Sequence, residues 1–280
     1  METHSPTTTG IEIIHPGFRR DGYRAALFDF DGTLSLLRRN WQDVMIPMMV
    51  EILTETGTSE SQAELSEQVE EFVMRLNGRQ TIYQMIQLAE EVTKRGGEAL
   101  EPLAYKHRYH DLLWQQVGGR IESVRTGAVS AEQMSVPGSR ELLQRLRDCG
   151  IALYLASGTD LAYVRSELAV LGLDSFFGEQ VYGALDDYKK FSKAMIIQRM
   201  IQDMQVPGEQ LLGFGDGFVE IEEVKRVGGL AIGVASNEVE RHGTNAWKRE
   251  RLIRAGADII LGDYRQCDTL FKLLGLSAKE

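Results

Sequence analysis

From Pro137 onward the chain alternates short apolar runs with amphipathic stretches, and this alternation most constrains its fold. Each apolar run has the length of a strand, and the residues between two runs repeat with the period of a helix. Alternation of this kind predicts a parallel sheet with helices on both of its faces. One earlier run belongs to the same sheet, so the predicted strands are 25–30, 151–157, 179–184, 210–216, 230–236 and 257–263.

Residues 36–135, between the first two predicted strands, have a different character. They are rich in Glu, Gln, Leu, Met and Arg, and apolar residues recur at helical spacing, as at Leu65, Val69 and Phe72. The expected fold class is therefore α/β, a Rossmann-like doubly wound parallel sheet core with an inserted α-helical cap domain. We expect residues 1–23 to form an irregular N-terminal arm, residues 24–35 and 136–280 the core, and residues 36–135 the cap.

Polar residues follow three of the predicted strands. In doubly wound sheets, ligands bind beyond the carboxyl ends of the strands, so we expect these residues to meet in one crevice. The lysines at 189, 190 and 193 precede a predicted helix and can reach the same crevice. The candidate site residues are Asp29, Asp31, Thr33, Ser157, Gly158, Lys193, Asp216 and Glu220.

Two of these carboxylates, those of Asp29 and Asp31, stand two residues apart. Within a strand such residues point to the same face, so the two side chains are expected side by side. Their repulsion requires a positive group or a shared proton nearby. Mg²⁺ bound by the carboxylates of Asp29 and Asp216 would meet that requirement, since Mg²⁺ is a hard cation that takes one or two carboxylates and keeps several waters.

These residue types suit phosphoryl transfer through an aspartyl-phosphate. Ionised Asp29 can attack phosphorus as a nucleophile. Ser157 and nearby backbone N–H groups can hold the phosphate oxygens, while Lys193 stabilises the developing charge. Neighbouring negative charge should raise the pKa of Asp31, which can then protonate the leaving oxygen and later take a proton from water.

In order, DFDGT, SGT, a lysine and GDGFVE resemble the four motifs of the haloacid dehalogenase-like hydrolase superfamily. The insertion after the first strand resembles its helical cap, as in the phosphatase branch with phosphoglycolate phosphatase and beta-phosphoglucomutase. The resemblance covers the core from about residue 24. It implies Asp29 as nucleophile and Asp31 as acid and base. It implies phosphate binding by Thr33, Ser157, Gly158 and Lys193, and Mg²⁺ binding by Asp29, Asp31 (through its carbonyl), Asp216 and Glu220.

At two positions the resemblance leaves the role of a residue open: the lysine of the third motif, and Glu220. Lys193 is preferred over Lys190, because SKAMIIQRM resembles the phosphoserine-phosphatase-like form of the lysine motif. Glu220 stands where many members carry Asp, and glutamate can bind the cation directly or through water. Relatives that cleave carbon–halogen or carbon–phosphorus bonds lack the second Asp of the first motif, so Asp31 points to a phosphatase or a phosphomutase.

The expected function is a Mg²⁺-dependent phosphatase acting on a small phosphorylated metabolite, with a sugar phosphate preferred on resemblance alone. A phosphomutase would share every core residue and is the alternative. From another class, Gly213, Gly215 and Gly217 resemble a dinucleotide-binding turn, with Glu238 as ribose partner. The spacing is GxGxG rather than GxGxxG, and Asp216 would repel a pyrophosphate. A binding module that has lost turnover is a further alternative.

Charge and composition narrow the partners. The net charge of −10 argues against nucleic acid as a general partner, because too few cations remain to neutralise phosphates. We read no signal peptide, no apolar run long enough to cross a membrane, and no metal or disulfide pattern in the two cysteines. We therefore expect a cytoplasmic protein whose partner is a small phosphorylated substrate, while the sequence does not indicate the oligomeric state.

Several polar side chains of the cap are candidates for reading the substrate, although an exposed helix face is the plainer role for any one of them. They are Arg38, Arg39, Trp41, Arg79, Gln80, Tyr83, Lys106 and Arg108. His107 and His110 share a helix face, but no third ligand is near in sequence. We expect them to pack or face solvent rather than to bind metal.

Overall fold

A single seven-stranded sheet forms the centre of the computed structural model, which describes residues 10–19 and 21–277. The strands lie in the order β1-β7-β6-β5-β2-β3-β4, and every neighbouring pair is parallel except β1 with β7. The strands are β1 (Ile11–Ile13), β2 (Ala25–Phe28), β3 (Ala152–Asp160), β4 (Val181–Ala184), β5 (Leu211–Gly215), β6 (Leu230–Val234) and β7 (Ile259–Leu261). The predicted α/β class is confirmed.

Strand β2 lies between β3 and β5, and all four of its residues are buried. Ala26 and Phe28 pack into the apolar core on one face of the sheet, while Ala25 and Leu27 pack into the core on the other. A continuous apolar run is what a strand covered on both faces requires. All six predicted strands are present, and β3 continues to Asp160 past a register shift against β4.

The sequence prediction of an irregular arm was wrong at Ile11–Ile13, which form β1 and pair antiparallel with β7. Ile11 is buried against the core, whereas Ile13 remains exposed. The alternation Ile-Glu-Ile is a period-two signal, but three residues are too few to separate it from a loop. Residues 1–9 and 20 of the predicted arm lie outside the described residues.

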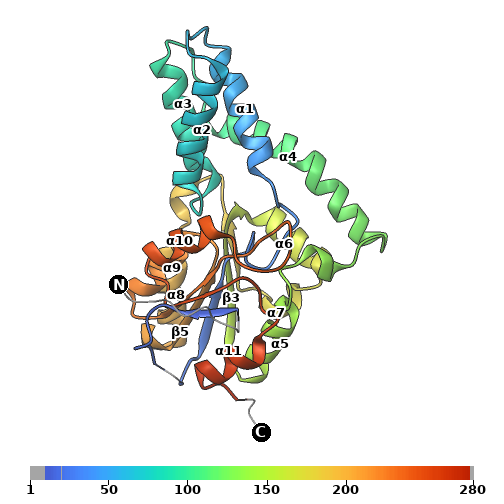
Figure 1. Ribbon diagram of the computed structural model, residues 1–280, viewed down its shortest axis with the longest axis vertical. Helices are drawn as coiled ribbons and strands as arrows, with labels where there is room; N and C mark the ends of the chain where they lie inside the picture. The colour runs from blue at the N-terminus through green and yellow to red at the C-terminus, as the bar shows by residue number, and fades with distance from the viewer. Residues whose placement is uncertain (1–9, 20, 278–280) are drawn as a thin grey trace.

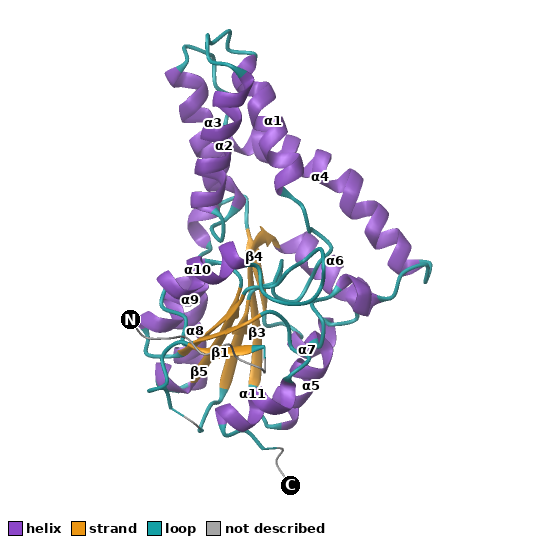
Figure 2. Cartoon of the chain, viewed as in Figure 1, coloured by secondary structure: helices purple, strands orange, loops and turns teal. Residues whose placement is uncertain are grey.

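Helices cover both faces of the sheet, as a doubly wound fold requires (Figures 1 and 2). The first apolar core receives α5 (Ser139–Asp148), α6 (Leu161–Leu171), α7 (Asp174–Phe177) and α11 (Cys267–Leu274). The second receives α8 (Lys193–Met204), α9 (Phe218–Arg226) and α10 (Ala246–Arg254). Short 3₁₀ helices lie at Ala131–Met134, Tyr188–Lys190 and Gly208–Gln210.

Four helices lie beyond one end of the sheet, and in the sequence they are inserted between β2 and β3 (Figure 1). They are α1 (Gln42–Thr54), α2 (Gln62–Leu76), α3 (Thr81–Lys94) and α4 (Pro102–Arg125). Residues 36–135 are all described, and none of them belongs to one of the seven strands, as predicted. These helices pack on one another through buried apolar residues such as Leu65, Val69 and Phe72.

Polar contacts hold the lower ends of α2 and α3 against the sheet layer. Arg251 of α10 donates to the backbone carbonyls of Arg75 and Asn77, at 3.1 and 2.8 Å. These carbonyls end α2, where no intrahelical N–H is left to pair with them. Gln80 Nε2 donates to the carbonyls of Tyr188 and Phe191, at 3.1 and 2.9 Å. The loop between α2 and α3 is thereby seated on the core.

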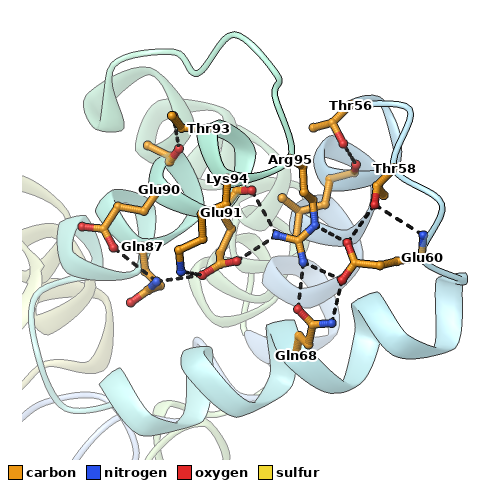
Figure 3. Close-up of polar contacts among 12 residues, drawn as sticks. Thr56, Thr58, Glu60, Gln68, Gln87, Glu90, Glu91, Thr93, Lys94 and Arg95 are labelled. Atoms are coloured by element: carbon orange, nitrogen blue, oxygen red, sulfur yellow. Dashed lines mark hydrogen bonds and ion pairs between the residues drawn. The ribbon is translucent and has the colours of Figure 1, made fainter.

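The far end of the four-helix segment is held by Arg95 (Figure 3). Its guanidinium donates to Glu60 at 2.5 and 2.9 Å, to Glu91 at 2.8 Å and to Gln68 at 2.7 Å. One side chain therefore joins α2, α3 and the loop that precedes α2. This network lies far from the sheet and leaves the lower end of the segment to face it.

None of the helices in the described part of the chain combines the length and the apolarity that a membrane span needs.

Candidate active site

A cavity opens at the carboxyl ends of β2, β3 and β5, beneath the loop between α2 and α3. Six of the eight residues predicted from sequence line it, and the structure brings these six together: Asp29, Asp31, Ser157, Gly158, Lys193 and Asp216. The predicted Thr33 and Glu220 do not line it. From the four-helix segment and its entry loop come Arg38, Trp41, Met45, Asn77, Gly78, Arg79, Thr81, Gln84 and Tyr109.

The buried Asp29 carboxylate directly follows β2 and receives a lysine. Lys193 Nζ lies 3.0 Å from Asp29 Oδ1 and 2.7 Å from Glu220 Oε2. The two carboxylates keep the pKa of Lys193 above its usual value, so the ammonium stays charged. Burial raises the pKa of Asp29, and Lys193 opposes that rise. Lys193 is placed here because it opens α8, where Ser192 caps the helix.

Asp31 lies in the turn after β2 and has other partners. Thr159 donates its hydroxyl to Asp31 Oδ2 at 2.8 Å. Arg38 Nε is 3.9 Å from Asp31 Oδ1, an atom that is buried and accepts no hydrogen bond. Burial raises the pKa of Asp31 to about 7, while Arg38 lowers it and Glu167 raises it.

The expectation that Asp29 and Asp31 lie side by side on one strand was wrong. Strand β2 ends at Phe28, and the chain then turns, with the N–H groups of Leu34 and Ser35 donating to the Phe30 carbonyl. The strand period therefore does not apply to the two aspartates. Asp29 contacts Lys193, whereas Asp31 contacts Thr159 and approaches Arg38.

Arg38 is itself held by a buried carboxylate. Its guanidinium donates to Glu167 of α6 through Nε at 3.1 Å and through Nη2 at 2.6 Å. Glu167 is fully buried and Arg38 nearly so. This paired geometry fixes the guanidinium plane beside Asp31 and over the Tyr163 ring. Arg38 was among the predicted cap residues, but nothing in the sequence indicated its partner Glu167.

Asp216 follows β5 and also contacts a lysine, Lys248 of α10, at 2.7 Å from its Oδ2. The same ammonium lies 2.6 Å from Glu238 Oε1. Gly32 has a positive φ and lies so close that an added Cβ would stand 2.2 Å from Asp216 Oδ2. Only glycine fits at this point of the turn. Sequence reasoning missed Lys248 because it lies on a helix face with no motif around it.

The Glu220 carboxylate is occupied by protein donors on both oxygens. Oε1 accepts the Gly217 N–H at 2.6 Å, which caps α9, and Oε2 pairs with Lys193. Its side chain packs under Gly215, where a Cβ would come within 2.1 Å. Glu220 thus holds Lys193 and the turn after β5, below the floor of the cavity.

A divalent cation fits the carboxylates that this cavity gathers. Oxygen atoms of Asp29, Asp216 and Glu220 lie within 4.8 Å of one another, and of these three residues Glu220 already has both oxygens paired within the protein. They form the single such group among residues 10–19 and 21–277. One oxygen of Asp29 pairs with Lys193, and one oxygen of Asp216 pairs with Lys248. The second oxygen of each carboxylate accepts no hydrogen bond from the described residues. Carboxylate oxygens in this number suit Mg²⁺.

Ser157 and Gly158 lie near the carboxyl end of β3, where its register shifts against β4, and both line the cavity. Ser157 Oγ accepts the Thr159 N–H at 3.0 Å, which leaves its own hydroxyl proton for a ligand. A Cβ on Gly158 would lie 2.9 Å from the carbonyl oxygen of Arg79. The absence of a side chain at 158 therefore lets the loop from the four-helix segment come down onto this end of β3.

Thr33 was predicted to bind phosphate, and the structure gives its side chain no route to do so. The residue is fully buried, its hydroxyl has no hydrogen-bond partner, and its carbonyl accepts from the Tyr264 hydroxyl at 2.9 Å. Thr33 belongs to the turn that supports the site from below.

The sequence left open whether Lys193 or Lys190 is the lysine of the site. Lys193 lines the cavity, whereas Lys190 is exposed and pairs with Asp187 at 3.0 Å. Of the cap candidates, Arg38, Trp41 and Arg79 line the cavity. Lys106 and His110 instead meet Asp160, and Arg108 pairs with Glu51 at the surface.

The glycines of the dinucleotide-like turn have packing roles. A Cβ on Gly213 would lie 2.4 Å from the Val224 side chain, and one on Gly215 would meet Glu220. Both glycines are needed for α9 to pack against β5. Glu238, the ribose candidate, is paired with Lys248. The site therefore does not favour the dinucleotide alternative.

A doubly wound sheet with lysine-paired carboxylates at the ends of its central strands defines an α/β protein with an acidic cavity. Residues 23–228 match the family model of haloacid dehalogenase-like hydrolases, and the chain belongs to this family. The predicted family is thereby confirmed. No curated protein matches the chain.

Solved structures of the family share the fold. A predicted phosphoglycolate phosphatase from Haemophilus somnus 129pt is 16% identical, with a TM-score of 0.58 over 89% of this chain and 97% of that chain. Beta-phosphoglucomutase from Clostridium difficile is 13% identical, with a TM-score of 0.58 over 90% and 97%. A family hydrolase from Deinococcus radiodurans R1 with bound phosphate and sodium is 17% identical, with a TM-score of 0.53 over 92% and 99%.

Proposed function

We propose that the protein is a Mg²⁺-dependent phosphatase that hydrolyses a small phosphorylated metabolite through an aspartyl-phosphate. The observation that carries this proposal is the pairing of a buried lysine, Lys193, with Asp29 at the end of the central strand. The lysine keeps positive charge where a phosphoryl group must approach an anionic nucleophile. The family and the phosphatases among its solved structures support the same reaction.

In the proposed first step, a carboxylate oxygen of Asp29 attacks phosphorus and the bond to the leaving-group oxygen breaks. Asp31 gives its proton to that oxygen, so the alcohol leaves neutral. The raised pKa of Asp31, about 7, supports this role because the carboxyl holds a proton near neutrality. The hydroxyl of Ser157, nearby backbone N–H groups and Lys193 hold the phosphoryl oxygens.

In the second step, Asp31 accepts a proton from water while the water oxygen attacks phosphorus. The acyl-phosphate bond breaks, and Asp29 and inorganic phosphate are released. Asp29, Asp216 and the carbonyl of Asp31 would hold the Mg²⁺, with Glu220 orienting Lys193. When bound, the cation neutralises phosphate charge and the repulsion among the carboxylates. Without it, Asp216 and Glu220 raise the pKa of Asp29.

We further propose that residues 36–135 act as a cap over residues 24–35 and 136–280. The loop between α2 and α3 covers the cavity, and Arg38, Trp41 and Arg79 line it from this side. A cap that closes would exclude bulk water before the first step and admit one water for the second. Closure over the cavity favours a small phosphomonoester such as a sugar phosphate as substrate.

The test is phosphate release from a panel of phosphorylated metabolites, with and without added Mg²⁺. The proposal expects release from at least one small phosphomonoester, dependent on Mg²⁺ and abolished in Asp29→Asn. Conversion of a sugar monophosphate to its isomer without phosphate release would instead identify a phosphomutase and overturn the hydrolase proposal.

A further inference from the structure

Lys248 places a buried ammonium group against the metal-side carboxylate Asp216. Its Nζ lies 2.7 Å from Asp216 Oδ2, 2.6 Å from Glu238 Oε1 and 3.1 Å from Ser236 Oγ. The side chain is only 9% exposed.

The position of this lysine is fixed from several directions. Lys248 lies in the first turn of α10, and its backbone N–H donates to the Asn245 side chain at 3.0 Å, which caps the helix. Ser236, just after β6, donates its hydroxyl to the Gly32 carbonyl at 2.6 Å. The ends of β6 and α10 are thus tied to the turn that carries Asp29 and Asp31.

The contact has a consequence for how Asp216 can bind a cation. Its Oδ2 lies against the ammonium, so Oδ1 is the oxygen of Asp216 that has no ion pair within the described residues. Mg²⁺ takes single carboxylate oxygens in an octahedron and keeps several waters. Ca²⁺ takes six to eight oxygens and often binds a carboxylate through both of them. A lysine on one oxygen therefore penalises Ca²⁺ more than Mg²⁺.

We propose that Lys248 is a positioning residue that sets the metal selectivity of this site by keeping Asp216 monodentate. This inference rests on the proposed Mg²⁺-dependent function, because it assumes that the cation binds between Asp29 and Asp216. A fixed positive charge beside the ligand oxygen also weakens the binding of every cation. Lys248 thus favours a cation that is small and readily exchanged.

The test measures cation binding directly, by calorimetric titration of the full chain with MgCl2 and with CaCl2 and without substrate. In Lys248→Met, the removal of the charge should tighten Mg²⁺ binding by roughly tenfold. Ca²⁺ should gain more, because Oδ2 is then available, so the preference for Mg²⁺ should fall by at least about another tenfold. A structural role alone would not change this ratio.

Two further variants serve as controls for the change in cation preference. Lys225→Met removes a lysine whose Nζ lies 2.7 Å from the buried Asp258, away from the cavity, and should leave both affinities unchanged. Glu238→Gln keeps Lys248 on Asp216 but removes the neighbouring negative charge. It should weaken both cations by a similar factor and so preserve their ratio. It also provides the measurement if Lys248→Met does not fold.

The outcomes separate this inference from the proposed function. An unchanged ratio in Lys248→Met, or a changed ratio in Glu238→Gln, would overturn the role of Lys248 while leaving the phosphatase intact. Wild-type protein that binds neither cation would overturn both the role of Lys248 and the metal dependence.

Discussion

Thr159 donates its hydroxyl to Asp31 across the ends of two neighbouring strands, with 2.8 Å between Thr159 Oγ1 and Asp31 Oδ2. The other oxygen of this carboxyl is buried, has no hydrogen-bond partner and lies 3.9 Å from Arg38. One oxygen is therefore anchored by a hydrogen bond while the other accepts none. This asymmetry is what an acid that must reach a leaving group requires.

Replacing Thr159 by Val tests the anchor. The variant keeps the shape of the side chain and loses one hydrogen bond to a carboxyl group, which is worth about 1.5 kcal/mol. We expect kcat to fall by roughly tenfold, since about 1.4 kcal/mol is a factor of ten in rate, with KM changed far less. Steady-state kinetics on the best substrate of the panel measures both. A kcat equal to the wild-type value would mean that the hydroxyl does not position Asp31.

Replacing Asp31 by Asn removes the proposed acid and keeps the side-chain size. General acid–base catalysis contributes about 10²–10⁴-fold, so turnover should fall by that order. The loss should be greatest for alkyl phosphates and smallest for aryl phosphates, whose leaving groups need no proton. The dependence of kcat/KM on the leaving-group pKa measures this. An equal loss for all leaving groups would contradict a role in protonation.

The buried pair of Arg38 and Glu167 should matter for stability. Removing one partner of a buried ion pair leaves an unpaired charge and costs about 3–5 kcal/mol. We expect Glu167→Ala to lower the free energy of unfolding by about this amount in urea titrations. The double variant Arg38→Met/Glu167→Leu should recover most of the loss, because an apolar pair of similar size replaces the charges. A double variant that stays as unstable as Glu167→Ala would show that the unpaired charge of Arg38 does not cause the loss.

His110 should make stability depend on pH. Burial lowers its pKa from 6.5 to about 3, so the folded chain keeps the ring neutral while the unfolded chain protonates it. A lowered folded pKa stabilises the protein above the unfolded pKa, and this contribution is lost as pH falls from about 6.5 toward 3. At pH 5 the loss is about 2 kcal/mol. The charged groups that face the ring are Arg38, Lys106, His107, Asp160 and Asp186.

Unfolding free energies of His110→Gln and wild type at pH 7.5 and pH 5 test this. The wild type should lose about 2 kcal/mol more than the variant between these pH values. His107→Gln, on the exposed side of the same helix, is the matched control and should behave as the wild type does. Parallel losses in wild type and His110→Gln would show that another group causes the acid sensitivity.

The sequence predicts the part of the site that strand ends determine. Asp29, Ser157 and Asp216 each follow an apolar run, and parallel strands bring their carboxyl ends to one edge. Glu167 and Lys248 carry no such signal, because each lies on a helix and meets the site through contacts far apart in sequence. The pair of Arg38 and Glu167 spans 129 residues. Such partners follow from how the helices pack, which local patterns do not specify.

Two local predictions failed for physical reasons. The period of a strand was applied to Asp29 and Asp31, but β2 ends one residue before Asp29 and the following turn separates their partners. Thr33 was placed with the phosphate-binding residues because it belongs to the DFDGT motif of the family resemblance. The same turn carries its side chain into the interior, where it is fully buried.

The most direct test of the central claim is detection of a phosphoryl group on Asp29. Protein mixed with its best substrate and quenched in acid within the first turnover should yield a peptide containing Asp29 that carries one phosphoryl group, as measured by mass spectrometry. We expect this species in the wild type and its absence in Asp29→Asn, which should also lose turnover. A phosphoryl group on another residue, or substantial turnover by Asp29→Asn, would contradict the aspartyl-phosphate mechanism.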